Sequence, residues 1–247
     1  MIPLKSKEDL EMLKKSARIL VKIMNKLRGV VAVGVSTAEI DKLAGELAYK
    51  EGAIPAFKGY KGYPANICTS INEEIVHGIP SDRRLKDGDI ISLDMGINYD
   101  GYFTDAAFTV EIGKVDAKTR KLVEVTKGAL SEGIKKARPK NRLSDISYAI
   151  QSYVERYGFS VVREFVGHGI GFSLHEEPEI PNYGMPNSGP VLKNGMVLAI
   201  EPMVNAGTWK SKILDNGWTA VTFDGKPSAH FEHTVAITEN GPEILTC

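Results

Sequence analysis

Apolar residues recur at three- and four-residue steps in four stretches of the chain, which predicts four amphipathic helices. The first helix begins after Ser6, which with Asp9 resembles a capping box, and it ends at Gly29. The second begins at Ser36, with a glutamate three residues on, and ends at Gly52. The residues predicted to face inward are Leu10, Leu13, Ala17, Leu20, Met24 and Leu27 in the first helix, and Ile40, Leu43, Ala44 and Leu47 in the second.

The same plan restarts after Glu111. Helices are predicted from about 117 to 137, where Pro139 follows, and from 144 to 157, where Gly158 follows. Strand-like sequence fills 53–110 and resumes at 160. Two helices followed by a sheet, twice over, indicate one α+β domain of two related halves, about 1–112 and 113–247, that share one sheet and one core.

The composition narrows the class of partner. Lysine plus arginine (31) equals aspartate plus glutamate (31), so bulk charge gives no attraction to nucleic acid or membrane surfaces. The N-terminus carries charges where a signal peptide needs apolar residues, and no apolar run approaches the roughly 20 residues of a membrane span. Cys68 and Cys247 fit neither a disulfide framework nor a zinc ribbon, so we expect unpaired thiols and a cytoplasmic protein.

Four carboxylates stand inside apolar, strand-like segments. They are Asp94 in IISLDMGI, Asp105 in YFTDAAFTV, Glu201 in MVLAIEPMV and Glu232 in HFEHTVAI. A buried carboxylate must be protonated, paired with a cation or bound to metal. A salt bridge would explain a single acid of this kind, whereas four in one chain predict bound metal.

A hairpin turn signal, NYDG at 98–101, separates the first two acids. A turn centred on YD would make Asp94 and Asp105 cross-strand partners, whereas a turn centred on DG would set Asp94 opposite Ala107, with Asp105 as its diagonal neighbour. Either register points both carboxylates to one face, where a divalent cation would remove their repulsion.

Histidines add candidate ligands. His168 and His175 lie in GHGIGFSLHEEP, and their spacing of seven excludes a zincin helix. Four carboxylates and a neutral imidazole carry about the charge that two divalent ions cancel, so the residues indicate a two-metal hydrolase using manganese, iron, cobalt or zinc. His77, in VHGIP, is more typical of a loop histidine. His230 shares a face with the acid two residues on, His233 points away from it, and both are interpreted as structural.

Five segments carry a family resemblance: NEEIVHGIP, SLDMGINYDGYFTDAAFTV, GHGIGFSLHEEP, LAIEPM and FEHT. In their order and separations they resemble the successive signatures of the bacterial type I methionine aminopeptidases. The resemblance implies the pita-bread (creatinase/aminopeptidase) fold, in which two pseudo-symmetric halves of helices and antiparallel strands enclose a central metal site. We expect the minimal form, without the N-terminal zinc-binding extension of eukaryotic type I enzymes.

The resemblance also implies a role for each candidate ligand. Asp105 and Glu232 would bridge two divalent ions, His168 and Glu201 would complete the ligands of the first ion, and Asp94 would hold the second. Glu201 would also accept the proton of the water that attacks the peptide carbonyl.

Two further histidines would act on the substrate. The resemblance implies that His175 stabilises the developing oxyanion and that His77 contacts the scissile-bond nitrogen or the residue after it. It also implies that the substrate's free α-amine binds at the second metal. A pocket for the methionine side chain would be lined by Phe57, Tyr60, Tyr63, Cys68, Leu174 and Trp218.

The implied activity is removal of the initiator methionine from new proteins whose second residue is small. Two alternatives are a proline-type aminopeptidase of the same fold, which usually has an additional N-terminal domain, and a non-enzymatic pita-bread binding protein, which typically has lost metal ligands. We expect a monomer that acts on methionine peptides and nascent chains, with neither DNA nor a membrane as partner. The basic cluster Arg83, Arg84 and Lys86 fits a solvated loop better than contact with ribosomal RNA near the exit tunnel.

Overall fold

A computed structural model describes residues 2–247. Within this range the four predicted helices are confirmed to within two residues at each end. They are α1 (Lys7–Val30), α2 (Thr37–Lys50), α3 (Ala117–Lys136) and α4 (Leu143–Arg156). Ser6 and Ser36 form the predicted capping boxes at the starts of α1 and α2. Asp116, which the sequence interpretation missed, caps α3 by accepting hydrogen bonds from two backbone N–H groups.

The main sheet has nine strands, all paired antiparallel. Its principal order is β1-β4-β5-β14-β9-β7-β8, with β2 also paired to β4 and β15 to β14. The first half of the chain supplies β1 (Ile54–Pro55), β2 (Cys68–Ile71), β4 (Ile90–Tyr99) and β5 (Tyr102–Glu111). The second supplies β7 (Gly167–Gly169), β8 (Glu176–Ile180), β9 (Val197–Ile200), β14 (Glu232–Thr238) and β15 (Gly241–Ile244). The two halves therefore share one sheet, while their origin by duplication stays a prediction.

Shorter elements complete the fold. One three-stranded sheet joins β6 (Ser160–Val161), β10 (Met203–Asn205) and β13 (Ser228–His230), and another joins β3 (Glu74–Val76), β11 (Ser211–Ile213) and β12 (Ala220–Thr222). A 3-10 turn, η1, spans Tyr60–Gly62.

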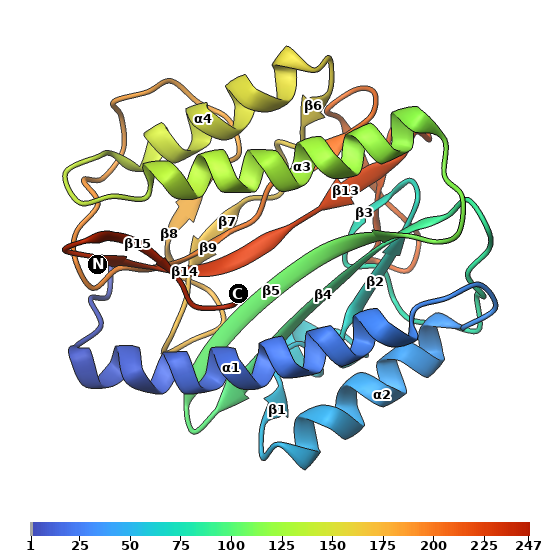
Figure 1. Cartoon of the computed structure of the whole chain (residues 1–247), viewed down its shortest axis with the longest axis horizontal. Coiled ribbons are helices and arrows are strands. Elements are labelled where there is room, and N and C mark those ends of the chain that lie inside the picture. The colour runs from blue at the N-terminus through green and yellow to red at the C-terminus, as the bar shows by residue number, and fades with distance from the viewer. Residues whose placement is uncertain (1) are drawn as a thin grey trace.

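The helices lie along the sheet in two pairs. Figure 1 shows α1 and α2 below the strands and α3 and α4 above them, with β5 and β14 running between the pairs. The largest core cluster includes residues from every helix and from both halves of the sheet, among them Leu20, Ile40, Leu93, Ile146 and Leu198. No helix in residues 2–247 is long and apolar enough to cross a membrane.

The hairpin of β4 and β5 adopts the second of the two predicted registers. Asp94 pairs with Ala107, and Asp105 pairs with Gly96. The turn residues Asp100 and Gly101 have φ angles of +53° and +84°, as a turn centred on this pair requires. Both carboxylates consequently lie on one face of the sheet.

Candidate metal centre

Five consecutive strands of the main sheet each supply one candidate ligand. Along the order β4, β5, β14, β9 and β7, the ligands are Asp94, Asp105, Glu232, Glu201 and His168. Glu201 directly follows the last residue of β9. The strand pairing thus gathers acids that are as far apart in sequence as 94 and 232.

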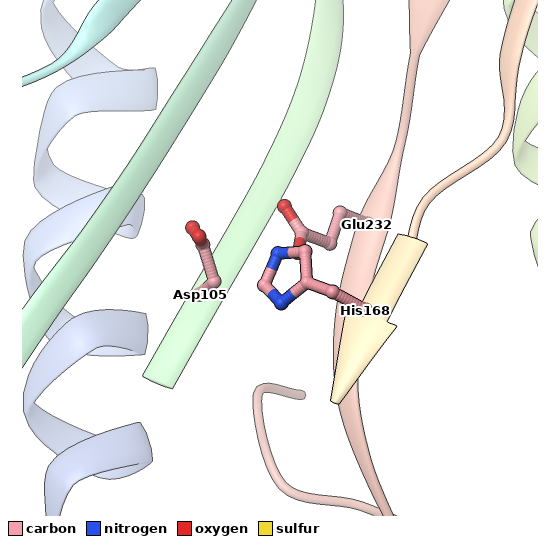
Figure 2. A group of neighbouring side chains, drawn as sticks. All are labelled: Asp105, His168 and Glu232. Atoms are coloured by element: carbon pink, nitrogen blue, oxygen red, sulfur yellow. The ribbon is translucent and has the colours of Figure 1, made fainter. Parts of the chain in front are cut away.

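The ligand atoms converge. One atom each from Asp105, His168 and Glu232 lies within 4.8 Å of the other two, and all three residues are buried. Figure 2 shows these side chains pointing toward one another from β5, β7 and β14. The Nε2 atom of His168 also lies 3.5 Å from a carboxylate oxygen of Glu201.

The tautomer of His168 follows from its other ring nitrogen. Nδ1 lies 2.9 Å from the carbonyl oxygen of Gly169, and a carbonyl can only accept a hydrogen bond. Nδ1 therefore carries the proton, and Nε2 presents its lone pair to the acids. Burial lowers the pKa of His168 to about 4, so the ring is neutral at physiological pH.

The cluster holds four buried carboxylic acids, and nearby protein groups do not supply enough positive charge to keep them all ionised. Burial raises the pKa of Asp105 to about 7 and raises the pKa values of Asp94, Glu201 and Glu232 well above their usual range. The neighbouring carboxylates raise the pKa of Asp94 further. Among residues 2–247, one buried oxygen each of Asp94 and Glu232 has no hydrogen-bond partner. Orphaned oxygens, clustered acids and a neutral imidazole fit divalent cations.

Every residue predicted for the site lines one cavity of about 220 Å³. Lys61, at η1, also lines it, although no sequence signal marked this residue. The predicted residues on its wall are Phe57, Tyr60, Tyr63, Cys68, His77, Asp94, Asp105, His168, Leu174, His175, Glu201, Trp218 and Glu232.

His175 lies between the ligands and the aromatic wall. Its ring stacks on Tyr60 with centroids 5.1 Å apart, and it lies 4.2 Å from the ring of His168. Partial burial, followed by the neighbouring His168, Lys61 and His77, lowers the pKa of His175 to about 3. The ring is therefore a neutral hydrogen-bond donor at physiological pH.

His77 occupies the loop after β3 in a strained backbone conformation. Its φ is +59°, a region that residues other than glycine rarely adopt. The next residue must be small, because a Cβ on Gly78 would lie 2.2 Å from the carbonyl oxygen of Thr69. The His77 ring meets those of Phe165 and Trp218 edge-on, at 5.4 and 6.4 Å. Burial lowers its pKa, so this ring too is neutral.

Apart from Lys61, the remainder of the cavity wall is aromatic and apolar. Tyr63 packs edge-on against both Trp218 and Phe57, with centroids 5.1 and 6.5 Å apart. The absence of a side chain at Gly96 makes room, since a Cβ there would lie 2.9 Å from the Phe57 ring. Burial raises the pKa of Cys68 well above its usual value, so it remains a thiol.

The last two histidines lie on opposite sides of the sheet. His233 points away from the centre, as predicted, and its Nδ1 lies 3.1 Å from Thr246 Oγ1. His230 is buried beside the centre, with Nε2 3.6 Å from a carboxylate oxygen of Glu201. It arrives there because β13 pairs with β10, which sets His230 opposite Met203.

The basic cluster predicted as a solvated loop is largely paired with nearby groups. Arg83 lies 3.0 Å from a carboxylate oxygen of Glu74. Arg84 donates a hydrogen bond of 2.7 Å to the carbonyl oxygen of Gly34 and lies 3.5 Å from Glu39.

Comparisons with known proteins identify the family of the chain. The model of metallopeptidase family M24 matches residues 11–239. The chain is 54% identical over 246 residues to methionine aminopeptidase 1 of Bacillus subtilis and 52% identical to the methionine aminopeptidase of Clostridium perfringens, in each case over 100% of the chain and 99% of that protein. The crystal structure of the Thermotoga maritima methionine aminopeptidase superposes with a TM-score of 0.98 at 47% identity, covering 100% of the chain and 99% of that structure.

Proposed function

The chain belongs to metallopeptidase family M24, and from this premise we propose that it removes methionine from the N-termini of peptides and nascent proteins. The observation that carries the proposal is that four carboxylates and a histidine share one cavity with an aromatic wall. The cluster supplies the chemistry and the pocket supplies the selectivity.

We propose that Asp94, Asp105, His168, Glu201 and Glu232 hold two divalent ions, with Asp105 and Glu232 shared between them. The orphaned oxygens and the raised pKa values support this assignment, because a cation would satisfy the oxygens and stabilise the ionised acids. When bound, divalent ions polarise a carbonyl and lower the pKa of water. Glu201 would accept the proton that the attacking water gives up.

The neutral rings of His175 and His77 would act on the peptide bond itself. The neutral His175 ring can donate a hydrogen bond from its N–H group to the oxygen on which charge develops. His77, on the Trp218 side of the cavity, would contact the nitrogen of the scissile bond or the residue after it.

The aromatic wall would select the side chain that is removed. Its residues are Phe57, Tyr60, Tyr63, Cys68, Leu174 and Trp218, and their apolar surfaces suit an apolar side chain. Sulfur makes favourable contacts with aromatic edges, and the edge-on arrangement of Tyr63 and Trp218 offers them.

The two alternatives gain no support. A pita-bread protein that only binds partners would not need the complete set of acids, whose burial without a cation is costly. The relatives from Bacillus subtilis and Clostridium perfringens, which share about half of this chain's residues, are methionine aminopeptidases rather than proline-specific enzymes.

We further propose that the protein acts in the cytoplasm, in keeping with its two free cysteines. We also propose that it acts as a monomer. We do not propose that Arg83, Arg84 and Lys86 dock on the ribosome, because the first two side chains already pair with acids of the same chain.

Anaerobic metal reconstitution would test the proposed reaction. The metal-free protein is loaded separately with manganese, iron, cobalt and zinc, and each form is assayed on a Met-Gly peptide, with Leu-Gly, Pro-Gly and acetyl-Met-Gly peptides as controls. We expect methionine release with at least one metal and at least about a hundredfold preference over the controls. Efficient release of proline or leucine, or no release with any metal, would overturn the proposal.

A further inference from the structure

A second cleft lies on the helix side of the sheet and has a volume of about 560 Å³. Helices α1 and α3 form its walls, and β5 and β14 form its floor. Figure 1 shows these two helices on either side of the two strands. Each helix presents one face to the cleft, because the wall residues follow at three- and four-residue steps: Val21, Met24 and Arg28 on α1, and Lys127, Leu130 and Ile134 on α3.

The floor of this cleft is the reverse side of the metal centre. Ala106 follows Asp105 on β5, and His233 follows Glu232 on β14. Successive side chains of a strand point to opposite faces, so Ala106 and His233, which pair across the two strands, face the cleft while the carboxylates of Asp105 and Glu232 face the other cavity. One layer of backbone separates the cleft from the catalytic cavity.

The walls carry an excess of positive charge. Arg28, Lys127, Lys135 and Arg138 all line the cleft. Within residues 2–247, only Lys135 among these four has a carboxylate side chain in ion-pair distance, that of Glu132 at 2.6 Å. Glu232 and Cys247 also line the cleft, but within residues 2–247 no carboxylate lies in ion-pair distance of Arg28, Lys127 or Arg138.

The floor between these cations is apolar. It includes Phe108, Phe231 and Ile244, and the Arg28 guanidinium lies over the Phe108 ring at 4.1 Å from its centroid. The planar guanidinium is thus held at the edge of an apolar surface with its donors free for a second partner.

We propose that this cleft binds a small amphipathic anion, with its carboxylate between Arg28 and Lys127 and its apolar chain along the phenylalanine floor. The volume lies in the range of small-molecule sites. A neutral apolar ligand would leave the cations unpaired, and a purely ionic ligand would make no use of the aromatic rings. The cleft lies on the reverse face of the sheet, so ligand binding there can be tested independently of the aminopeptidase activity.

Decanoate is a suitable probe, because it combines one carboxylate with an unbranched apolar chain. Zinc-loaded protein is titrated with decanoate while the five histidines are followed by NMR and the affinity is measured by calorimetry. We expect saturable binding that shifts the resonances of His233, which lines the cleft, and leaves those of His168 and His175 in place.

Two pairs of substitutions separate the site from general charge effects. Arg28→Gln with Lys127→Gln should weaken decanoate binding about tenfold or more, since each charge-assisted hydrogen bond contributes about that factor. Lys26→Gln with Lys136→Gln removes the same charge from exposed positions of the same helices outside the cleft and should leave the affinity unchanged. Decanol should bind at least tenfold more weakly than decanoate.

Four results would overturn the proposal: no saturable binding, equal affinity for decanol, an unchanged affinity in the Arg28 and Lys127 variant, or shifts confined to the histidines of the catalytic cavity. Correct folding of each variant is checked by circular dichroism, and methionine release reports the catalytic face separately.

Discussion

The substitution Lys5→Met removes a buried charge whose ion pair with Glu176 holds the loop that carries His175. The Lys5 ammonium forms an ion pair with the Glu176 carboxylate, and the two side chains are 0% and 7% exposed. Glu176 also accepts hydrogen bonds from the backbone N–H groups of Phe172 and Ser173, at 2.6 and 3.0 Å. The pair therefore ties the segment before α1 to the turn that leads into His175.

The expected cost follows from this burial. Methionine keeps the apolar stem of lysine but not its charge, so Glu176 would retain two backbone donors and lose its cation. Breaking a buried ion pair in this way costs about 3–5 kcal/mol, because one charge is left uncompensated. In a chain of this size, 1 kcal/mol corresponds to about 2–4 °C in Tm, so we expect a fall of roughly 6–20 °C. The kcat value should also fall, because His175 precedes Glu176.

Thermal unfolding of Lys5→Met, Glu176→Gln and the double variant, at one fixed metal concentration, measures this pair. The double variant should lose less stability than the sum of the single variants, since the second substitution removes the orphaned charge. Lys7→Met, at an exposed position in the first turn of α1, is the matched control and should change stability little. A loss below about 1 kcal/mol for Lys5→Met, as for an exposed pair, would refute the reasoning.

Three further predictions concern the metal centre. Asp105→Asn should abolish activity and lower the metal content measured by elemental analysis, because an amide lacks the charge of a shared ligand; full activity with normal metal would contradict the two-metal assignment. His175→Ala should keep its metal and lose about 10²–10³ in kcat, whereas His168→Ala should bind metal more weakly and recover partly in excess metal. In the metal-free protein the buried carboxylates, with the pKa of Asp105 at about 7, are protonated in the folded state and ionised in the unfolded one, so their contribution to stability falls as pH rises from about 4 to 7. The buried histidines, whose pKa values are lowered, contribute in the opposite direction, so the acids are isolated by the effect of added metal. The rise in Tm on adding metal should consequently be larger at pH 8 than at pH 5.5, and a smaller rise at pH 8 would contradict this argument.

The helices were predictable because their signals are local. Ser6 and Ser36 cap their helices with acids three residues away, and Gly158 follows the end of α4, so each boundary depends on a few neighbouring residues. The hairpin of β4 and β5 was predictable only in part. Both possible registers put Asp94 and Asp105 on one face, and the positive φ angles of the turn decided between them.

Contacts between distant segments were not predictable in the same way. Nothing near His230 in the sequence indicates that β13 pairs with β10, yet this pairing brings its ring to 3.6 Å from Glu201. Lys61 likewise reaches the cavity through the conformation of η1, where its own φ is +48°. Such positions depend on which strands meet and how a loop bends, and these are properties of the whole fold.

The curvature of the sheet is the least local of these properties, and the metal centre depends on it. Neighbouring strands lie about 4.8 Å apart, so the three steps from β5 through β14 and β9 to β7 would span roughly 14 Å in a flat sheet. Ligand atoms of Asp105 on β5 and His168 on β7 nevertheless lie within 4.8 Å of each other. Side chains pointing straight out of a flat sheet would keep the spacing of their strands, so the sheet must curl toward the face that carries the ligands. The sequence reveals which residues could bind metal because burial makes acids costly, whereas the curl that brings them together arises only when both halves pack against their helices.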